Sequence, residues 1–77
     1  MLKLKRVPTH CGENTAYTVI DPEVYTGEGR IGRVSRRQDG PPKMPWTAYS
    51  YYGRTIGYYP TRARAVAQVY EEAAFRL

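Results

Sequence analysis

The segment 46–76, WTAYSYYGRTIGYYPTRARAVAQVYEEAAFR, has the pattern of two short strands followed by one helix. Its first half is rich in Tyr and Thr, which favour strands, and Gly53 can adopt the positive φ that a tight hairpin turn needs. Thr61 stands where a helix N-cap is expected, ahead of a run of Ala, Val and Arg. The segment therefore predicts a hairpin over 46–59 that leads directly into a helix over 61–76. Because one helix can cover only one face of a sheet, the other face is left for solvent or a partner.

Pairing the two strands around a two-residue turn at Tyr52 and Gly53 divides their side chains between two faces. One face holds Thr47, Tyr49, Tyr51, Arg54, Ile56 and Tyr58. The other face, with small residues at its centre, holds Trp46, Ala48, Ser50, Thr55, Gly57 and Tyr59. At the helical period, the apolar stripe of the helix consists of Ala63, Val66, Ala67, Tyr70, Ala73, Ala74 and Leu77. We therefore expect the helix to bury Trp46 and Tyr59, together with its own Tyr70.

Upstream of the hairpin, the region 16–37 is expected to hold a first pair of strands, at 17–20 and 31–36. Prolines and a lack of periodicity mark 38–45 as a loop, and residues 1–15 are either weakly structured or an edge strand. The order of these elements predicts an α+β fold, an antiparallel meander of three to four strands packed on one C-terminal helix.

Composition limits the size and the partners of the protein. Seventy-seven residues make one small domain, 1–77, with a modest core. The net charge of +5 favours an acidic partner, either nucleic acid or an acidic protein surface. One cysteine, Cys11, cannot form an internal disulfide, and no stretch approaches the roughly 18 apolar residues of a membrane span. The expected location is therefore the cytoplasm, without a membrane partner.

No motif for a metal, cofactor or catalytic group has the context that it needs. Structural zinc normally takes four ligands, and the chain has one His and one Cys, His10 and Cys11. Gly27, Gly29 and Gly32 match the dinucleotide fingerprint, but a strand rather than a helix is expected after them. The sequence also lacks a nucleophile elbow and a clear carboxylate pair. We therefore expect a non-catalytic protein with no metal and no cofactor.

Arginine and tyrosine gather on or beside the face that the helix leaves open. Arginine suits bidentate contacts to phosphate, and tyrosine rings can stack on bases. The predicted binding residues are Tyr49, Tyr51, Arg54, Tyr58, Arg33 and Arg36. Tyrosines that pack across strands also stabilise a sheet without any partner, so their pattern by itself leaves both interpretations open.

The run WTAYSYYGRTIGYYPTRARAVAQVYEEA resembles the small amino-terminal arm-binding domain of tyrosine recombinases and its plant relatives, over residues 46–77. The matching residues are an aromatic that opens a strand, a Gly-Arg turn, a second aromatic, and a Thr-capped helix: Trp46, Gly53, Arg54, Tyr59, Thr61, Ala65 and Val66. In that family the exposed face of a three-stranded sheet enters the DNA major groove. The resemblance thus implies a DNA contact for Tyr49, Tyr51, Arg54 and Tyr58. The small size of the chain would also suit a protein of a phage or mobile element.

Two classes of function remain open. The first is a nucleic-acid-binding module, and the second is a protein-binding regulator or inhibitor of a larger partner, because Tyr and Arg are also enriched at protein interfaces. The exposed face, with Tyr49, Ile56 and Tyr58, would in addition suit a two-fold homodimer contact. Binding that weakens steeply with salt would favour nucleic acid over a tyrosine-centred protein interface.

Overall fold

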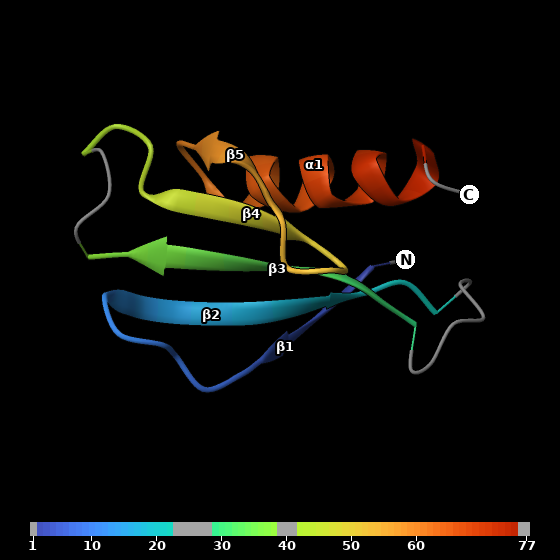
Figure 1. The fold of residues 1–77 in the computed structure, drawn as a ribbon, viewed down its shortest axis with the longest axis horizontal. Helices are drawn as coiled ribbons and strands as arrows, with labels where there is room; N and C mark the ends of the chain where they lie inside the picture. The colour runs from blue at the N-terminus through green and yellow to red at the C-terminus, as the bar shows by residue number, and fades with distance from the viewer. Residues whose placement is uncertain (1, 23–28, 39–41, 76–77) are drawn as a thin grey trace.

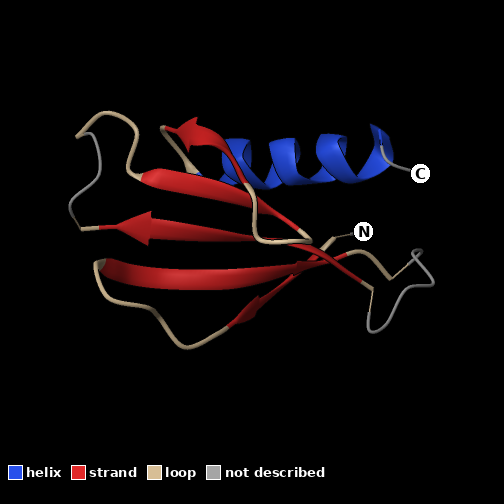
Figure 2. Cartoon of the chain, in the orientation of Figure 1, coloured by secondary structure: helices blue, strands red, loops and turns tan. Residues whose placement is uncertain are grey.

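In the computed structural model, which describes residues 2–22, 29–38 and 42–75, five strands form one antiparallel sheet in chain order. The strands are β1 (Lys3–Arg6), β2 (Glu13–Ile20), β3 (Arg30–Arg37), β4 (Trp46–Ser50) and β5 (Thr55–Tyr59). The helix α1 (Arg62–Phe75) follows β5 and packs on β3, β4 and β5 (Figure 1, Figure 2). The expected α+β class is confirmed, but the described sheet has five strands rather than three to four.

The strand that the sequence did not clearly predict is β1. All four residues of its sequence, KLKR, are exposed. The strand therefore has no buried side that would require apolar residues at alternate positions. The strand pairs with β2, with Lys3 opposite Ile20 and Leu4 opposite Val19. A short edge strand rich in lysine is held mainly by its backbone pairing, which a sequence pattern does not report. The next strand, β2, also begins at Glu13, upstream of the region 16–37 where the first strand pair was expected.

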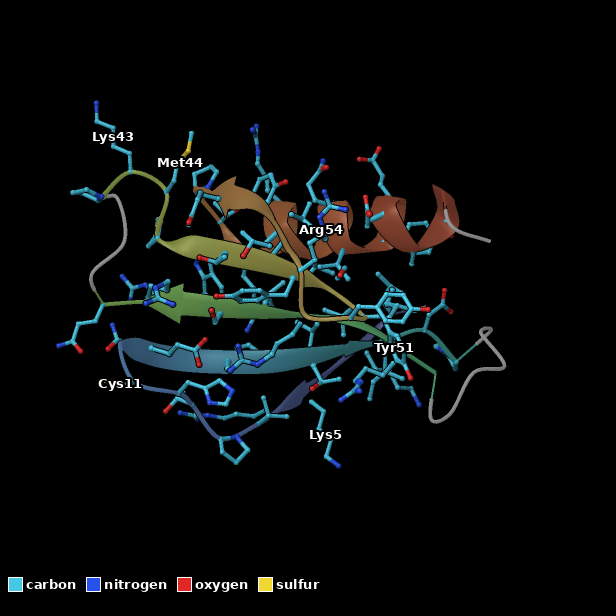
Figure 3. The ribbon with its side chains drawn as sticks, viewed as in Figure 1. Lys5, Cys11, Lys43, Met44, Tyr51 and Arg54 are labelled. Carbon is cyan, nitrogen blue, oxygen red and sulfur yellow. The ribbon has the colours of Figure 1, made fainter. Side chains whose placement is uncertain are left out.

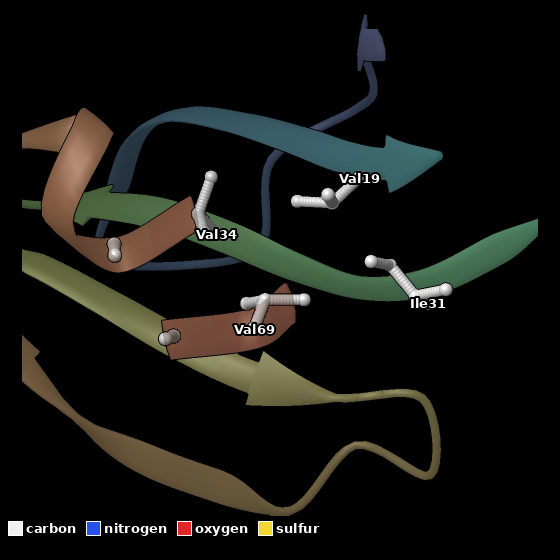
Figure 4. Packing of buried hydrophobic residues seen from close by; sticks show 6 residues of the cluster. Val19, Ile31, Val34 and Val69 are labelled. Atoms are coloured by element: carbon white, nitrogen blue, oxygen red, sulfur yellow. The ribbon is translucent and has the colours of Figure 1, made fainter. Parts of the chain in front are cut away.

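The core lies between α1 and the strands beneath it (Figure 4). Its buried residues are Val19, Ile31, Val34, Ala48, Ala65 and Val69. The helix approaches β3 closely at Gly32, where a Cβ atom would lie 2.5 Å from Cγ1 of Val69 and 2.5 Å from the carbonyl oxygen of Tyr49. Small residues on the sheet and the helix therefore allow the two layers to come into direct contact.

The buried face of α1 differs from the stripe that the sequence predicts. Four residues expected in that stripe are exposed: Ala63, Ala67, Tyr70 and Ala74. The observed face is centred on Ala65 and Val69, with Val66 and Ala73 partly buried, while Leu77 lies outside the described residues. Alanines occur on both the exposed and the buried sides of this helix, so the apolar period did not fix its rotation. The packing of Val69 onto β3 fixes it instead.

The β4–β5 hairpin closes one residue earlier than a two-residue turn would. The backbone N–H of Ser50 donates to the carbonyl of Arg54 at 2.8 Å, and the N–H of Gly53 donates to the carbonyl of Ser50 at 3.0 Å. Gly53 has a φ of 83°, the left-handed conformation expected of it. The longer loop leaves Tyr51 out of the strand and places Tyr49 opposite Thr55, where Ile56 was expected.

Two β-bulges turn isoleucine side chains towards the helix. Ile56 is the extra residue where the register of β5 shifts against β4, and Ile31 is the extra residue where β3 shifts against β2. Ile31 is buried in the core and Ile56 packs against it, although strict alternation would place both on the opposite face. The expectation that Ile56 lies on the exposed face is therefore wrong.

The start of α1 and the adjoining end of the sheet follow the sequence more closely. Thr61 caps the helix, since its Oγ1 accepts a hydrogen bond of 3.2 Å from the backbone N–H of Arg64. Trp46 and Tyr59 lie opposite each other and pack against the core, but both are half-buried rather than fully covered. Trp46 instead stacks on Tyr17 of β2, with ring centroids 6.4 Å apart.

Candidate functional site

The sheet face opposite α1 presents side chains in rows that cross the strands. One row consists of Lys5, Thr18, Arg33 and Tyr49, each opposite the next. The neighbouring row consists of Ala16, Ser35, Thr47 and Tyr58. We call this whole side of the sheet, which carries both rows, the open face. No described helix packs on it, because α1 contacts the other side of β3, β4 and β5.

An ion pair joins β2 and β3 on the open face. Both amino groups of the Arg33 guanidinium donate to the Glu13 carboxylate, at 2.7 and 2.6 Å. The backbone N–H of His10 donates to the same carboxylate at 2.7 Å. The side chain of Glu13 is 2% exposed and that of Arg33 is 22% exposed, so the pair is largely shielded from water. Such a bidentate pair fixes the orientation of both side chains.

This ion pair changes the acid–base behaviour of both partners. The hydrogen bonds from Arg33 lower the pKa of Glu13 from 4.5 to about 2, against the opposing effect of burial. The hydrogen bond to Glu13 in turn raises the pKa of Arg33. Glu13 is therefore ionised at neutral pH and neutralises much of the charge of Arg33.

Two arginines lie over tyrosine rings along this side of β3. The guanidinium carbon of Arg33 is 5.7 Å from the ring centroid of Tyr49, and that of Arg30 is 5.2 Å from the ring centroid of Tyr51. Tyr51 also meets Tyr52 edge to face, with centroids 5.2 Å apart. Distances within about 6 Å are those of cation–π contacts. The contacts hold the arginines and tyrosines together as a single cationic and aromatic surface.

A shallow hollow of about 370 Å³ lies within this surface. Arg30, Tyr51 and Gly53 line one part of it, and Glu13 and Arg37 are also among its lining residues. Thr18, Arg33 and Tyr49, which form most of the first row, line it as well. The volume is at the lower end of the range for small-ligand pockets.

The structure brings together only some of the residues that the sequence predicts for a site. Tyr49, Tyr51 and Arg33 all line the hollow, and Tyr58 lies on the open face in the neighbouring row. Arg54 is exposed in the hairpin loop and does not line the hollow. Arg36 lies opposite Trp46, on the side of the sheet that carries the helix, so its placement beside Arg33 was wrong. Residues three apart on a strand point to opposite faces.

Other residues of the hollow were not predicted from the sequence. Arg30, Glu13 and Thr18 reach it because β2 and β3 pair along most of their length. Lys5 joins the same row through the pairing of β1 with β2. The only sequence signal was strand alternation, and it could not be applied without the register between these strands.

Several other features of the chain can be placed in the described structure. Cys11 is an exposed free thiol. It lies at one end of the sheet, and Tyr51 lies at the other end (Figure 3). Within residues 2–22, 29–38 and 42–75, no three His, Cys, Asp or Glu side chains gather as metal ligands. The described helix is too short and too polar to cross a membrane. After Gly29, the chain enters β3 rather than a helix, and Gly27 lies outside the described residues.

The fold and the open face define a small protein with a meander sheet, one covering helix and a second sheet face on which two arginines lie over tyrosine rings. No family model matches the chain, and no significant match is found among curated proteins or solved structures.

Proposed function

We propose that this chain is a non-catalytic protein that binds nucleic acid through the open face. The observation that carries the proposal is the contact of Arg30 with Tyr51 beside the hollow, which Tyr49 also lines. Tyrosine rings offer surfaces for base stacking, and arginine offers paired donors to phosphate. Both chemistries occur within one solvent-accessible surface.

The charges around this surface add to the support. Lys3 and Lys5 alternate with residues that face the helix side, so both belong to the open-face side of β1. Arg30 is also exposed. It pairs with Ile20 of β2, which pairs with Lys3 on its other side. The carboxylate of Glu13 is already held by Arg33. An approaching phosphate therefore meets an excess of cations, as electrostatic binding of nucleic acid requires.

A protein partner is the alternative that the Glu13–Arg33 pair favours. The pair neutralises the arginine at the centre of the surface, and tyrosine with arginine is also the composition of protein-binding hot spots. The two partners differ in salt dependence. Nucleic-acid affinity should fall linearly with salt on logarithmic axes, whereas a tyrosine-centred protein interface should change much less.

Two arginines of β3 provide a matched test. Arg30 and Arg36 are both exposed on the same strand, but Arg30 lies over Tyr51 while Arg36 lies on the helix side. We expect Arg30→Ala to weaken binding of a fluorescent random-sequence oligonucleotide and to reduce the salt slope by about one unit. Arg36→Ala should change neither, although it removes the same net charge.

The readout is fluorescence anisotropy across a series of salt concentrations, with circular dichroism to confirm that each variant is folded. Equal losses for Arg30→Ala and Arg36→Ala would mean that binding depends on net charge and not on the open face. An absence of binding by the unmodified protein at low salt would remove the proposal.

A further inference from the structure

The width of the sheet restricts which form of nucleic acid the open face can take, if the proposed function holds. Five strands at about 4.8 Å spacing place the outer two roughly 19 Å apart. The major groove of duplex DNA is about 12 Å wide. A three-stranded sheet spans only about 10 Å and fits such a groove. The two additional strands would bring the sheet against the phosphate backbones before its centre reached the bases.

The strands that widen the sheet also belong to the surface. β1 and β2 supply Lys5 and Thr18 to the same row as Arg33 and Tyr49. A ligand that used the whole row would have to lie flat on about four strands. A flexible chain can follow such a surface, whereas a duplex touches it along one ridge.

The exposed tyrosines fit unpaired bases. Tyr51 is 45% exposed and Tyr58 is 51% exposed, while Tyr49 lines the hollow with Arg33 over its ring. A base inside a duplex is stacked on both sides and cannot place its face on such a ring, but an unpaired base can. Arg30 lies over one face of the Tyr51 ring, and Lys5 lies at the β1 end of the row. Both cations are therefore placed to meet the phosphates of a strand whose bases face the sheet.

We infer that the open face binds single-stranded nucleic acid, laid across β1 to β5, with bases against Tyr49, Tyr51 and Tyr58 and phosphates against Lys5 and Arg30. This inference rests on the proposed function and names the form of its ligand. It departs from the major-groove contact that the three-stranded family pattern implies, because the described sheet is wider.

Direct comparison of probes tests the inference. Fluorescein-labelled single-stranded DNA and RNA of about 12 nucleotides, within the range that such surfaces cover, are compared with hairpin duplexes of the same sequence. Anisotropy is measured at low and moderate salt. We expect either single strand to bind at least about tenfold more tightly than its duplex, the factor that one base-stacking contact provides.

Three exposed tyrosines provide matched variants. Tyr51→Ala and Tyr58→Ala should each weaken single-strand binding about tenfold, since each removes a stacking surface. Tyr70→Ala should not, although Tyr70 is 47% exposed, because it lies on α1. Tyr51→Phe should bind as well as the unmodified protein, since the ring and not the hydroxyl makes the contact.

The outcomes separate the two proposals. No binding to any probe would remove the proposed function itself. Binding to a duplex as tightly as to its single strand would leave that function standing and overturn the inference. Losses in Tyr51→Ala and Tyr58→Ala that match the effect of Tyr70→Ala would also overturn it, because the rings of the open face would then have no special role.

Discussion

Glu13 shows how a residue on the open face can serve the fold rather than a ligand. Its carboxylate accepts hydrogen bonds from Arg33 and from the backbone of His10, and its side chain is almost fully shielded from water. An arginine held in this way cannot turn towards a phosphate without leaving a buried carboxylate unpaired. We therefore assign Arg33 chiefly to the sheet and Arg30 to the proposed contact.

The first prediction concerns acid stability. The pKa of Glu13 is lowered in the folded protein from 4.5 to about 2, so its contribution is complete above pH 4.5. As the pH falls from 4.5 towards 2, the folded state should lose that contribution, about 2 kcal/mol after allowance for solvent screening. Urea unfolding followed by circular dichroism at several pH values measures this loss.

The control for this prediction is Glu13→Gln. It should be less stable than the unmodified protein at pH 7 and should show a flatter pH dependence between pH 4.5 and 2. Parallel curves for the two proteins would show that other carboxyl groups cause the acid transition.

The second prediction concerns Thr47, which lies on the open face but is 2% exposed. Its hydroxyl has no hydrogen-bond partner among the described residues. A buried hydroxyl without a partner costs free energy, and valine has nearly the same shape without it. Thr47→Val should therefore raise the free energy of unfolding by about 1 kcal/mol.

Thr18→Val is the matched control for Thr47→Val, because Thr18 lies on the same face but is only half-buried and lines the hollow. Its side chain is partly exposed to solvent, so Thr18→Val should show a smaller gain in stability. Urea denaturation of both variants compares them, and a loss of stability in Thr47→Val would indicate that its hydroxyl has a partner in solution.

At the scale of elements, the rotation of α1 gives the third prediction. Val69 is fully buried against the sheet, whereas Tyr70 is exposed. Val69→Ala should reduce the free energy of unfolding by about 2 kcal/mol through lost burial and a cavity. Tyr70→Ala should cost no more than about 0.5 kcal/mol, as exposed substitutions do.

Thermal and urea denaturation of both variants decides between the two rotations of the helix. The helix face predicted from the apolar period of the sequence would make Tyr70→Ala more destabilising than Val69→Ala. A larger loss in Tyr70→Ala than in Val69→Ala would restore the helix face that the sequence predicts.

For the whole molecule, we expect a monomer. The two-fold contact that the sequence allows depended on Ile56 lying between Tyr49 and Tyr58, but Ile56 packs against the core instead. A contact through the open face would also bring the Lys5 and Arg30 side chains of two copies together, which like-charge repulsion opposes. Light scattering at rising protein concentration tests this, and a dimer mass at low salt would contradict it.

The sequence by itself determined the local structure of the second half of the protein. Gly53 adopts the positive φ that the hairpin needs, Thr61 caps the helix, and Thr47 lies opposite Tyr58 as alternation predicts. Each of these features depends on residues close together in the chain. Their energies are set by local backbone geometry and short-range hydrogen bonds, which residue type largely decides.

Tertiary structure alone decided which residues of β1, β2 and β3 join Thr47, Tyr49 and Tyr58 on the open face. The register between β2 and β3 places Glu13 against Arg33, and the bulges at Ile31 and Ile56 reverse the alternation that a strand pattern assumes. The rotation of α1 depends on how Val69 packs onto the sheet, since alanines lie on both its exposed and its buried sides. Contacts between distant segments set these features, and a pattern within one segment does not contain that information.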